Sequence, residues 1–130
     1  NYMAHNQAGK EIFVNHRNNL KGYPIDYCYK ARFITGDDQG HIWIGTTVGA
    51  LMMDADFKNP EDVKFRHFLR VPDNEHSLSN NDVHWIVSTR NKELFIATFG
   101  GGLNKLVSLD ESGNACFKSY TVQDGLPSDV

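Results

Sequence analysis

Long hydrophobic runs are missing from this chain of 130 residues. Its longest apolar stretches, such as residues 42–44, are far shorter than the roughly 20 residues that a membrane-spanning helix needs. An excess of basic residues is missing as well, because 13 Lys and Arg stand against 16 Asp and Glu. The chain therefore lacks the electrostatic footprint of a nucleic-acid-binding protein. We expect this segment to contact neither nucleic acid nor membrane.

Cysteine is scarce, with Cys28 and Cys116 as the only two in the chain. Two cysteines build neither a disulfide framework nor a four-cysteine zinc site. The six histidines form no HExxH or HxxxH pair, so we expect no metal. The glycine-rich segment 99–105 lacks the spacing of a phosphate-binding loop, and no helical pattern follows it, so we expect no cofactor.

What the chain does contain is an internal repeat. Residues 32–51 recur at 84–103, at a shift of 52 positions, and the same shift relates Phe13 to Phe65 and Phe65 to Phe117. The aligned pairs are Phe33 with Trp85, Ile34 with Ile86, Trp43 with Phe95, Ile44 with Ile96, Gly49 with Gly101, Leu51 with Leu103 and Phe68 with Tyr120. Because Trp43 and Phe95 are equivalent, as are Phe65 and Phe117, we interpret these four as core residues.

Each repeat unit has the pattern of four short strands. Residues 85–87 and 94–96 are β-branched and aromatic runs bounded by polar turns, and no stretch keeps a helical period. The third and fourth strands are predicted at 50–54 and 64–69, and again at 102–107 and 116–122. Four short antiparallel strands repeated about every fifty residues are typical of β-propeller blades.

We therefore predict an all-β fold, a β-propeller fragment with two four-stranded antiparallel blades plus an extra outer strand. Residues 1–30 are expected to hold the end of a preceding blade, with its outer strand near 11–16, and a connection. Residues 31–82 form one blade and its connection, and residues 83–130 form a second blade and the start of the next. We interpret the chain as a piece of a larger protein.

Four strings of the sequence carry a family resemblance. They are GHIWIGT at 40–46, SLSNNDV at 77–83, TFGGGLNK at 98–105 and DGLPSDV at 124–130. Together they resemble two-component regulator propeller repeats, and they are similar to the sensor region of hybrid two-component systems from gut Bacteroides. The second unit departs from the repeat pattern, with Phe95 and Ala97 in place of the usual Trp and Gly.

The resemblance implies a function in carbohydrate sensing and signal transduction. In that family the propellers are periplasmic, as part of an inner-membrane protein, and precede an immunoglobulin-like domain, a membrane helix, a histidine kinase, a receiver and a DNA-binding output. The family recognises oligosaccharides released from polysaccharides and controls transcription of the genes for their use. This segment has no phosphoacceptor motif, receiver or helix-turn-helix, so we expect it to be non-catalytic, whereas the parent protein is expected to be a histidine kinase.

Ligand-binding residues are expected where units differ. In a propeller, the connections between blades and the turns between the second and third strands share one face. Sugars are recognised by flat aromatic side chains beside groups that form paired hydrogen bonds. The candidates on this face are Tyr23, Tyr27, Tyr29, Arg32, His84 and Phe99. The alternative for the tyrosines is that they only hold their connection in place.

Two other functions fit the same repeat: a fragment of a propeller glycoside hydrolase or lyase, and a pure dimerisation scaffold. The acidic residues lie mostly in turns and no GxSxG motif is present, so we expect no catalysis in this segment. The expected partners are an oligosaccharide, bound through the parent ectodomain, and other propeller blades. A homo-oligomer is also expected, because an arc of blades leaves two faces uncovered.

Overall fold

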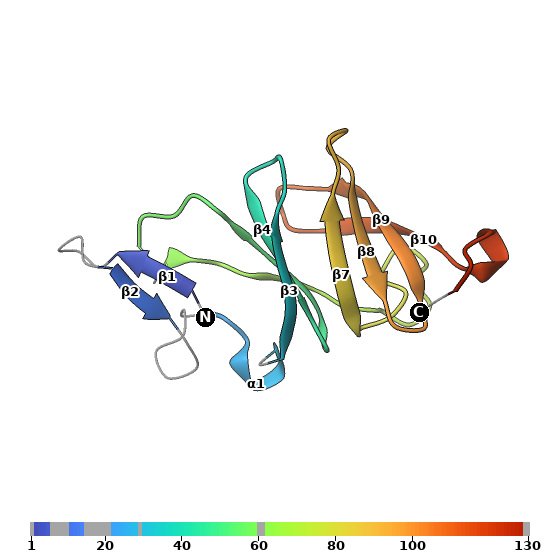
Figure 1. The fold of residues 1–130 in the computed structure, drawn as a ribbon, viewed down its shortest axis with the longest axis horizontal. Coiled ribbons are helices and arrows are strands. Elements are labelled where there is room, and N and C mark those ends of the chain that lie inside the picture. Colours follow the sequence, from blue (N-terminus) through green and yellow to red (C-terminus); the bar gives the residue numbers. More distant parts are fainter. Residues whose placement is uncertain (1, 6–10, 15–21, 29, 60–61, 129–130) are drawn as a thin grey trace.

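The computed structural model describes residues 2–5, 11–14, 22–28, 30–59 and 62–128. In these residues the fold consists of two four-stranded antiparallel sheets and a two-stranded hairpin. In the view of Figure 1 the hairpin lies to one side of the first sheet and the second sheet lies to the other side. The predicted all-β fold with two four-stranded antiparallel sheets is confirmed.

The two sheets are built alike, each with its strands in sequence order. The first sheet contains β3 (Ala31–Gly36), β4 (His41–Thr46), β5 (Gly49–Asp54) and β6 (Arg66–Phe68). The second sheet contains β7 (Val83–Ser88), β8 (Leu94–Thr98), β9 (Gly102–Leu109) and β10 (Ala115–Tyr120). These bounds follow the predicted strands closely, because β-branched and aromatic runs between polar turns favour strands.

The sequence predicted a single extra strand near the N-terminus, but the structure pairs that strand with another one. β2 (Glu11–Val14) lies within the predicted range, but β1 (Tyr2–His5) pairs with it antiparallel along its whole length. Two helical elements were not predicted: α1 (Ile25–Cys28) and the 3₁₀-helix η2 (Val122–Asp124). Each is a single turn, too short to produce a helical period in the sequence.

The turns between the second and third strands differ in length by one residue. Thr46 of β4 is the partner of Gly49 of β5, so two residues form the turn between them. Thr98 of β8 is the partner of Gly102 of β9, so three residues form that turn. The second turn therefore holds one extra residue. Gly49 corresponds in structure to Gly102, and the predicted equivalence of Gly49 with Gly101 is wrong by one position.

The same offset places a buried amide where the first sheet has a leucine. Leu51 corresponds to Asn104 and not to Leu103, and Leu51 and Asn104 are both fully buried. The Asn104 Nδ2 group donates to Ser79 Oγ at 2.8 Å and to the Ile96 carbonyl at 3.2 Å, and Oδ1 accepts from the Ser79 backbone N–H at 2.9 Å. A buried amide is costly without hydrogen-bond partners, and these bonds provide them. The bonds to Ser79 also attach the loop before β7 to the second sheet.

The main core lies between the two sheets. The first sheet contributes Trp43, Ala50, Met52 and Phe68, and the second sheet with its preceding loop contributes Leu78, Val83, Ile86, Leu94, Ile96 and Phe117. Trp43 stacks on Phe68 with ring centroids 5.4 Å apart, and Phe68 meets Phe117 edge-on at 5.9 Å. A Cβ on Gly45 would lie 2.8 Å from Val83 Cγ1, so this glycine permits the close approach of β4 to β7.

The expected core role holds for two of the four aromatic residues. Trp43 and Phe117 are buried, as predicted. Phe65 is half-buried and packs with Met53 and Val63 in a smaller cluster on the outer side of the first sheet. Phe95 is also half-buried, because its side of the second sheet faces away from the first sheet.

Candidate functional site

Two of the predicted ligand residues meet where the two sheets adjoin. Arg32 in β3 and His84 in β7 are 52 positions apart, and the Arg32 Nη1 atom lies 2.6 Å from His84 Nε2. A guanidinium group can only donate hydrogen bonds, so Nε2 of the imidazole is the acceptor. This geometry requires the neutral form of His84 with its proton on Nδ1.

Asp82 completes a polar cluster with these two residues. Its Oδ1 atom lies 3.1 Å from Arg32 Nη1 and 3.9 Å from His84 Nε2. Oδ1 is buried and accepts no well-aligned hydrogen bond within the described part of the chain. The side chains of Arg32 and Asp82 are each about one third exposed, at 36% and 32%. A ligand would therefore meet the exposed parts of the Arg32 and Asp82 side chains, whereas Asp82 Oδ1 itself is out of its reach.

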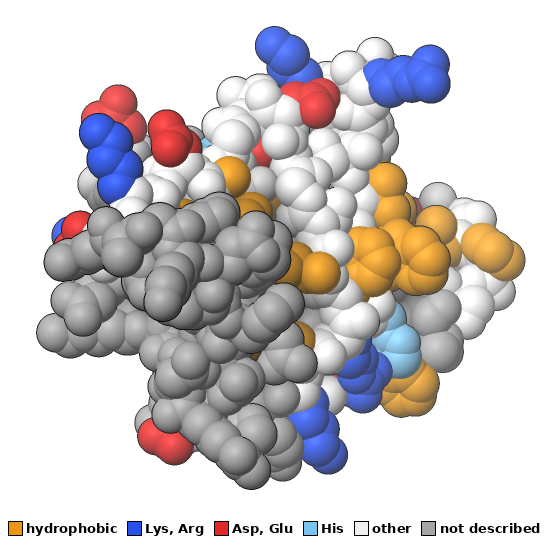
Figure 2. Space-filling model, turned by 60° about the vertical axis from the view of Figure 1, so that its left-hand side comes forward, with side chains coloured by type: hydrophobic (Ala, Val, Ile, Leu, Met, Phe, Trp, Pro, Cys, Tyr) orange, Lys and Arg blue, Asp and Glu red, His pale blue; other side chains and the backbone are white. Residues whose placement is uncertain are grey.

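Phe99 stands beside this cluster at the tip of the β8–β9 turn. Its ring stacks on the His84 imidazole with centroids 5.5 Å apart and planes 23° apart. The Phe99 backbone N–H donates to the Asp82 carbonyl at 2.8 Å, which ties the turn to the loop before β7. Phe99 is 51% exposed. Figure 2 shows one side of the molecule, where hydrophobic, basic and histidine side chains lie next to one another.

A second aromatic pair is formed by the residues that follow Arg32 in β3 and His84 in β7. Phe33 and Trp85 stack with centroids 5.0 Å apart and planes 24° apart, and Trp85 is 55% exposed. The structure thus brings Arg32, His84 and Phe99 together. Sequence reasoning missed two neighbours, Asp82 and Trp85. Asp82 directly precedes β7, and its place beside Arg32 depends on the conformation of the loop before that strand, which the sequence pattern does not give.

The predicted tyrosines lie elsewhere or outside the description. The Tyr23 hydroxyl donates to the Cys28 carbonyl at 2.7 Å, and its ring meets Phe65 edge-on at 5.2 Å. Burial raises the pKa of the Tyr23 hydroxyl, with a smaller contribution from Cys28. Tyr23 therefore holds the α1 segment in place. The backbone of Tyr27 belongs to α1, but its side chain and the whole of Tyr29 lie outside the described residues.

Cys28 and His67 are close without forming a nucleophilic pair. The Cys28 Sγ atom lies 3.7 Å from His67 Nε2, and that nitrogen lies 2.5 Å from the Val48 carbonyl. A carbonyl only accepts, so Nε2 carries a proton and cannot take one from the thiol. Burial raises the pKa of the Cys28 thiol, which is fully buried and uncharged. Cys28 and Cys116 are both free thiols.

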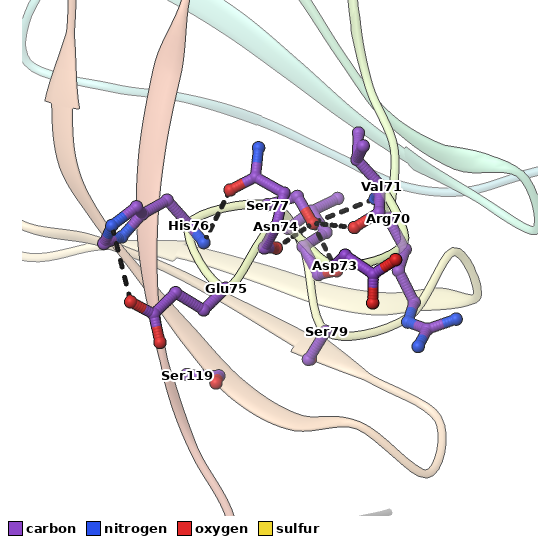
Figure 3. Close-up of a pocket in the computed structure, with 10 residues that line it drawn as sticks. Arg70, Val71, Asp73, Asn74, Glu75, His76, Ser77, Ser79 and Ser119 are labelled. Atoms are coloured by element: carbon purple, nitrogen blue, oxygen red, sulfur yellow. Dashed lines mark hydrogen bonds and ion pairs between the residues drawn. The ribbon is translucent and has the colours of Figure 1, made fainter.

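An open hollow lies over the loop before β7. It is lined by Arg70, Val71, Asp73, Asn74, Glu75, His76, Ser77, Leu78, Ser79 and Ser119 (Figure 3). The polar groups of this loop bond to one another. Ser77 Oγ accepts from the Val71 N–H at 2.9 Å and donates to the Asn74 carbonyl at 2.8 Å, and the His76 N–H donates to Asn74 Oδ1 at 3.0 Å. These bonds shape the loop, so the stronger site is the Arg32 cluster.

In the described residues, no group of three or more His, Cys, Asp or Glu side chains is arranged to hold a metal ion. The same part of the chain contains no helix with the length and apolar character that a membrane crossing requires. Comparison of the chain with protein-family models, with curated proteins and with solved structures gave no match.

Proposed function

We propose that this chain is a non-catalytic segment of a ligand-sensing β-propeller, and that the Arg32 cluster recognises an oligosaccharide. The parent protein would be a hybrid two-component sensor whose propeller is periplasmic, as part of an inner-membrane protein. The observation that carries the proposal is the cluster of Arg32, Asp82 and His84 beside the exposed ring of Phe99.

Repetition of the sheets supports the propeller. Two sheets with the same strand order pack face to face, and β7 lies beside β3 and β4 of the first sheet. Each sheet in a propeller covers the next, as the second sheet covers Trp43 here. The half-buried Phe95 occupies the place that corresponds to Trp43, so a further unit packed on the second sheet would bury it in the same way.

The chemistry of the cluster supports a sugar ligand. A pyranose ring has an apolar face and a rim of hydroxyl groups, so it packs on an aromatic ring while its hydroxyls form paired hydrogen bonds. Phe99 offers an exposed ring, Arg32 offers N–H donors and Asp82 offers a carboxylate. The charges of Arg32 and Asp82 compensate, which favours a neutral sugar over a strongly anionic one.

Signalling would follow from the position of the cluster. Arg32 belongs to the first sheet, whereas His84 belongs to the second sheet and Phe99 to the turn between β8 and β9 of that sheet. A ligand shifts a conformational equilibrium only by the difference in its affinity for the two states. A ligand that touches both units favours the arrangement in which these side chains are correctly spaced.

The test is calorimetric titration of the chain with a panel of neutral and acidic oligosaccharides. We expect a neutral oligosaccharide to bind, and Phe99→Ala and Arg32→Ala each to weaken binding by at least tenfold, equivalent to about 1.4 kcal/mol. Val71→Ala, at an exposed position away from the cluster, is the matched control and should leave affinity unchanged.

Two results would contradict the proposal. Binding that survives both Phe99→Ala and Arg32→Ala would exclude the cluster as the site. Cleavage of an oligosaccharide during the titration would exclude the non-catalytic role and favour the hydrolase or lyase alternative.

A further inference from the structure

Arg32 and His84 occupy the same irregularity in the two sheets. The residues on either side of Arg32 in β3 pair with consecutive residues of β4, so Arg32 is the extra residue of a β-bulge. His84 is the extra residue of the equivalent bulge between β7 and β8. A bulged residue is left out of the ladder of backbone pairing, and bulges re-aim side chains. The His84 side chain can therefore change its direction without breaking the pairing of β7 with β8.

His84 has two polar neighbours of opposite charge. Arg32 Nη1 lies 2.6 Å from its Nε2 atom, and Asp82 Oδ1 lies 3.9 Å from the same nitrogen. The Phe99 ring, which stacks on the imidazole from the β8–β9 turn, carries no charge. Among the described residues, Arg32 from β3 and Asp82 from the loop before β7 are thus the charged groups paired with His84.

The contact with Arg32 depends on a neutral imidazole. A guanidinium group stays charged and only donates, so His84 Nε2 accepts through its lone pair. A proton on Nε2 would turn this acceptor into a donor, and two positively charged donors would then face each other at 2.6 Å. The contact would break as a result. Histidine is the side chain whose charge ordinarily changes between about pH 5 and pH 8.

The protonated imidazole has an acceptor within reach. Asp82 Oδ1 is buried and accepts no well-aligned hydrogen bond within the described residues. A displacement of about 1 Å brings His84 Nε2 from 3.9 Å to the usual length of an N–H···O bond. That bond would join two charged groups, which makes it stronger than a neutral one. The stack on Phe99 is kept, because an aromatic face attracts a cation.

We propose that His84 is a proton-operated switch at the junction of the two sheets. Neutral His84 accepts from Arg32 and links β7 directly to β3. Protonated His84 turns to Asp82, which directly precedes β7, so the link between the sheets is replaced by a bond within the second unit. Acidification thereby frees the Arg32 guanidinium from His84. The proposal concerns the contacts among these three side chains and does not rest on oligosaccharide binding.

The first experiment locates the ring proton of His84 by NMR of the protein with isotope-labelled histidine. At pH 8 we expect the proton on Nδ1 and none on Nε2, and Arg32→Met, which removes the donors, should abolish this preference. His84→Ala identifies the signal. His76 is the internal control, since it is 63% exposed beside Glu75 and should not respond to Arg32→Met.

The second experiment measures both pairs by double-mutant cycles in urea denaturation at pH 8 and pH 5. Arg32→Met with His84→Ala should show a coupling of about threefold or more in the unfolding equilibrium constant at pH 8, as expected for an exposed polar pair, and none at pH 5. Asp82→Ala with His84→Ala should show the reverse. Arg32→Met with His76→Ala is the matched control and should show no coupling at either pH.

A proton on His84 Nε2 at pH 8 would overturn the proposal, since that nitrogen could not then accept from Arg32. Equal coupling of Arg32 with His84 at both pH values would also overturn it. A coupling of Asp82 with His84 that does not grow at pH 5 would exclude Asp82 as the partner of the protonated ring, and with it the switch. All these measurements are made without a sugar, so their outcome is independent of the oligosaccharide titration.

Discussion

At the scale of single residues, Asp37 accepts four hydrogen bonds through its two carboxylate oxygens. Its Oδ1 accepts from the backbone N–H groups of Gln39 and His41 at 2.8 and 2.9 Å. Its Oδ2 accepts from His41 Nδ1 and from Trp43 Nε1, both at 2.9 Å. Burial raises the pKa of Asp37, but these four hydrogen bonds to the charged form outweigh it and hold the pKa below its usual value.

Asp37→Asn should destabilise the protein by about 1–3 kcal/mol, because the amide N–H₂ group would face donors such as Trp43 Nε1. A carboxyl whose pKa is lowered by folding contributes stability that is present above its unfolded pKa of about 4 and is lost as pH falls through the folded value. The variant should therefore lose part of the acid dependence of stability. Urea denaturation at a series of pH values from 7 to 3 measures both effects.

Asp38→Asn is the control for this prediction, since it removes the same charge from the neighbouring exposed position. In Asp38→Asn, the urea concentration at the unfolding midpoint at pH 7 should stay close to that of the parent. The loss of stability as the pH falls should also be close to that of the parent. Equal acid dependence in the parent and in Asp37→Asn would contradict the role given to Asp37.

At the scale of elements, the tight turns depend on glycine for two separable reasons. Gly100 and Gly102 both have positive φ, at 75° and 76°. A Cβ on Gly102 would overlap the Tyr120 carbonyl oxygen, whereas a Cβ on Gly100 meets nothing within 4 Å. Gly100 is therefore needed only for its backbone conformation. Gly102 is needed for its backbone conformation and also because a side chain would not fit.

Gly100→Ala should cost about 1–2 kcal/mol, the usual penalty for an L-residue in the left-handed region. Gly102→Ala should cost clearly more, because β9 and β10 must separate to admit the methyl group. Thermal unfolding of the two variants side by side measures the difference. Equal losses would show that the contact with Tyr120 adds nothing.

Elements were the features most open to prediction from sequence. The aromatic and β-branched runs located all eight strands of the two sheets, because half-buried strands need such residues on one face. The correspondence failed by one residue after Phe99, since a turn can gain a residue without changing the strands on either side. Leu103 aligned with Leu51 by residue type, but backbone pairing puts the buried Asn104 there.

The candidate site was predictable only in part. Arg32, His84 and Phe99 come together because equivalent positions of neighbouring units adjoin, and the repeat supplied that information. Asp82 escaped notice because its place beside Arg32 depends on the conformation of the loop before β7. That conformation is set by local bonds, such as the donation of the Asp82 N–H to Asn80 Oδ1 at 2.9 Å.

At the scale of the whole molecule, the two tryptophans separate internal packing from exposed surface. Trp43 is fully buried between the sheets, whereas Trp85 is 55% exposed with its ring stacked on Phe33. Trp43→Ala should destabilise the protein by about 3–5 kcal/mol, the cost of truncating a buried aromatic side chain. Trp85→Ala should cost about 1 kcal/mol or less, from the lost stack on Phe33.

Guanidinium denaturation monitored by circular dichroism provides both values. If Trp43→Ala is too unstable to fold, Trp43→Phe keeps the ring type found at Phe95 and should show a smaller loss in the same direction. Comparable losses for the alanine variants of both tryptophans would contradict the assignment of the core to the space between the sheets.

Arg32 joins the first sheet to the second through polar contacts with both His84 and Asp82. A molecule bound to both Arg32 and Phe99 would bridge the two sheets. Because its ends would be anchored in different sheets, its binding would resist any rocking of one sheet against the other. If such a molecule binds, its binding would change the stiffness of the junction between the sheets, and slower amide exchange along β3 and β7 would register that change.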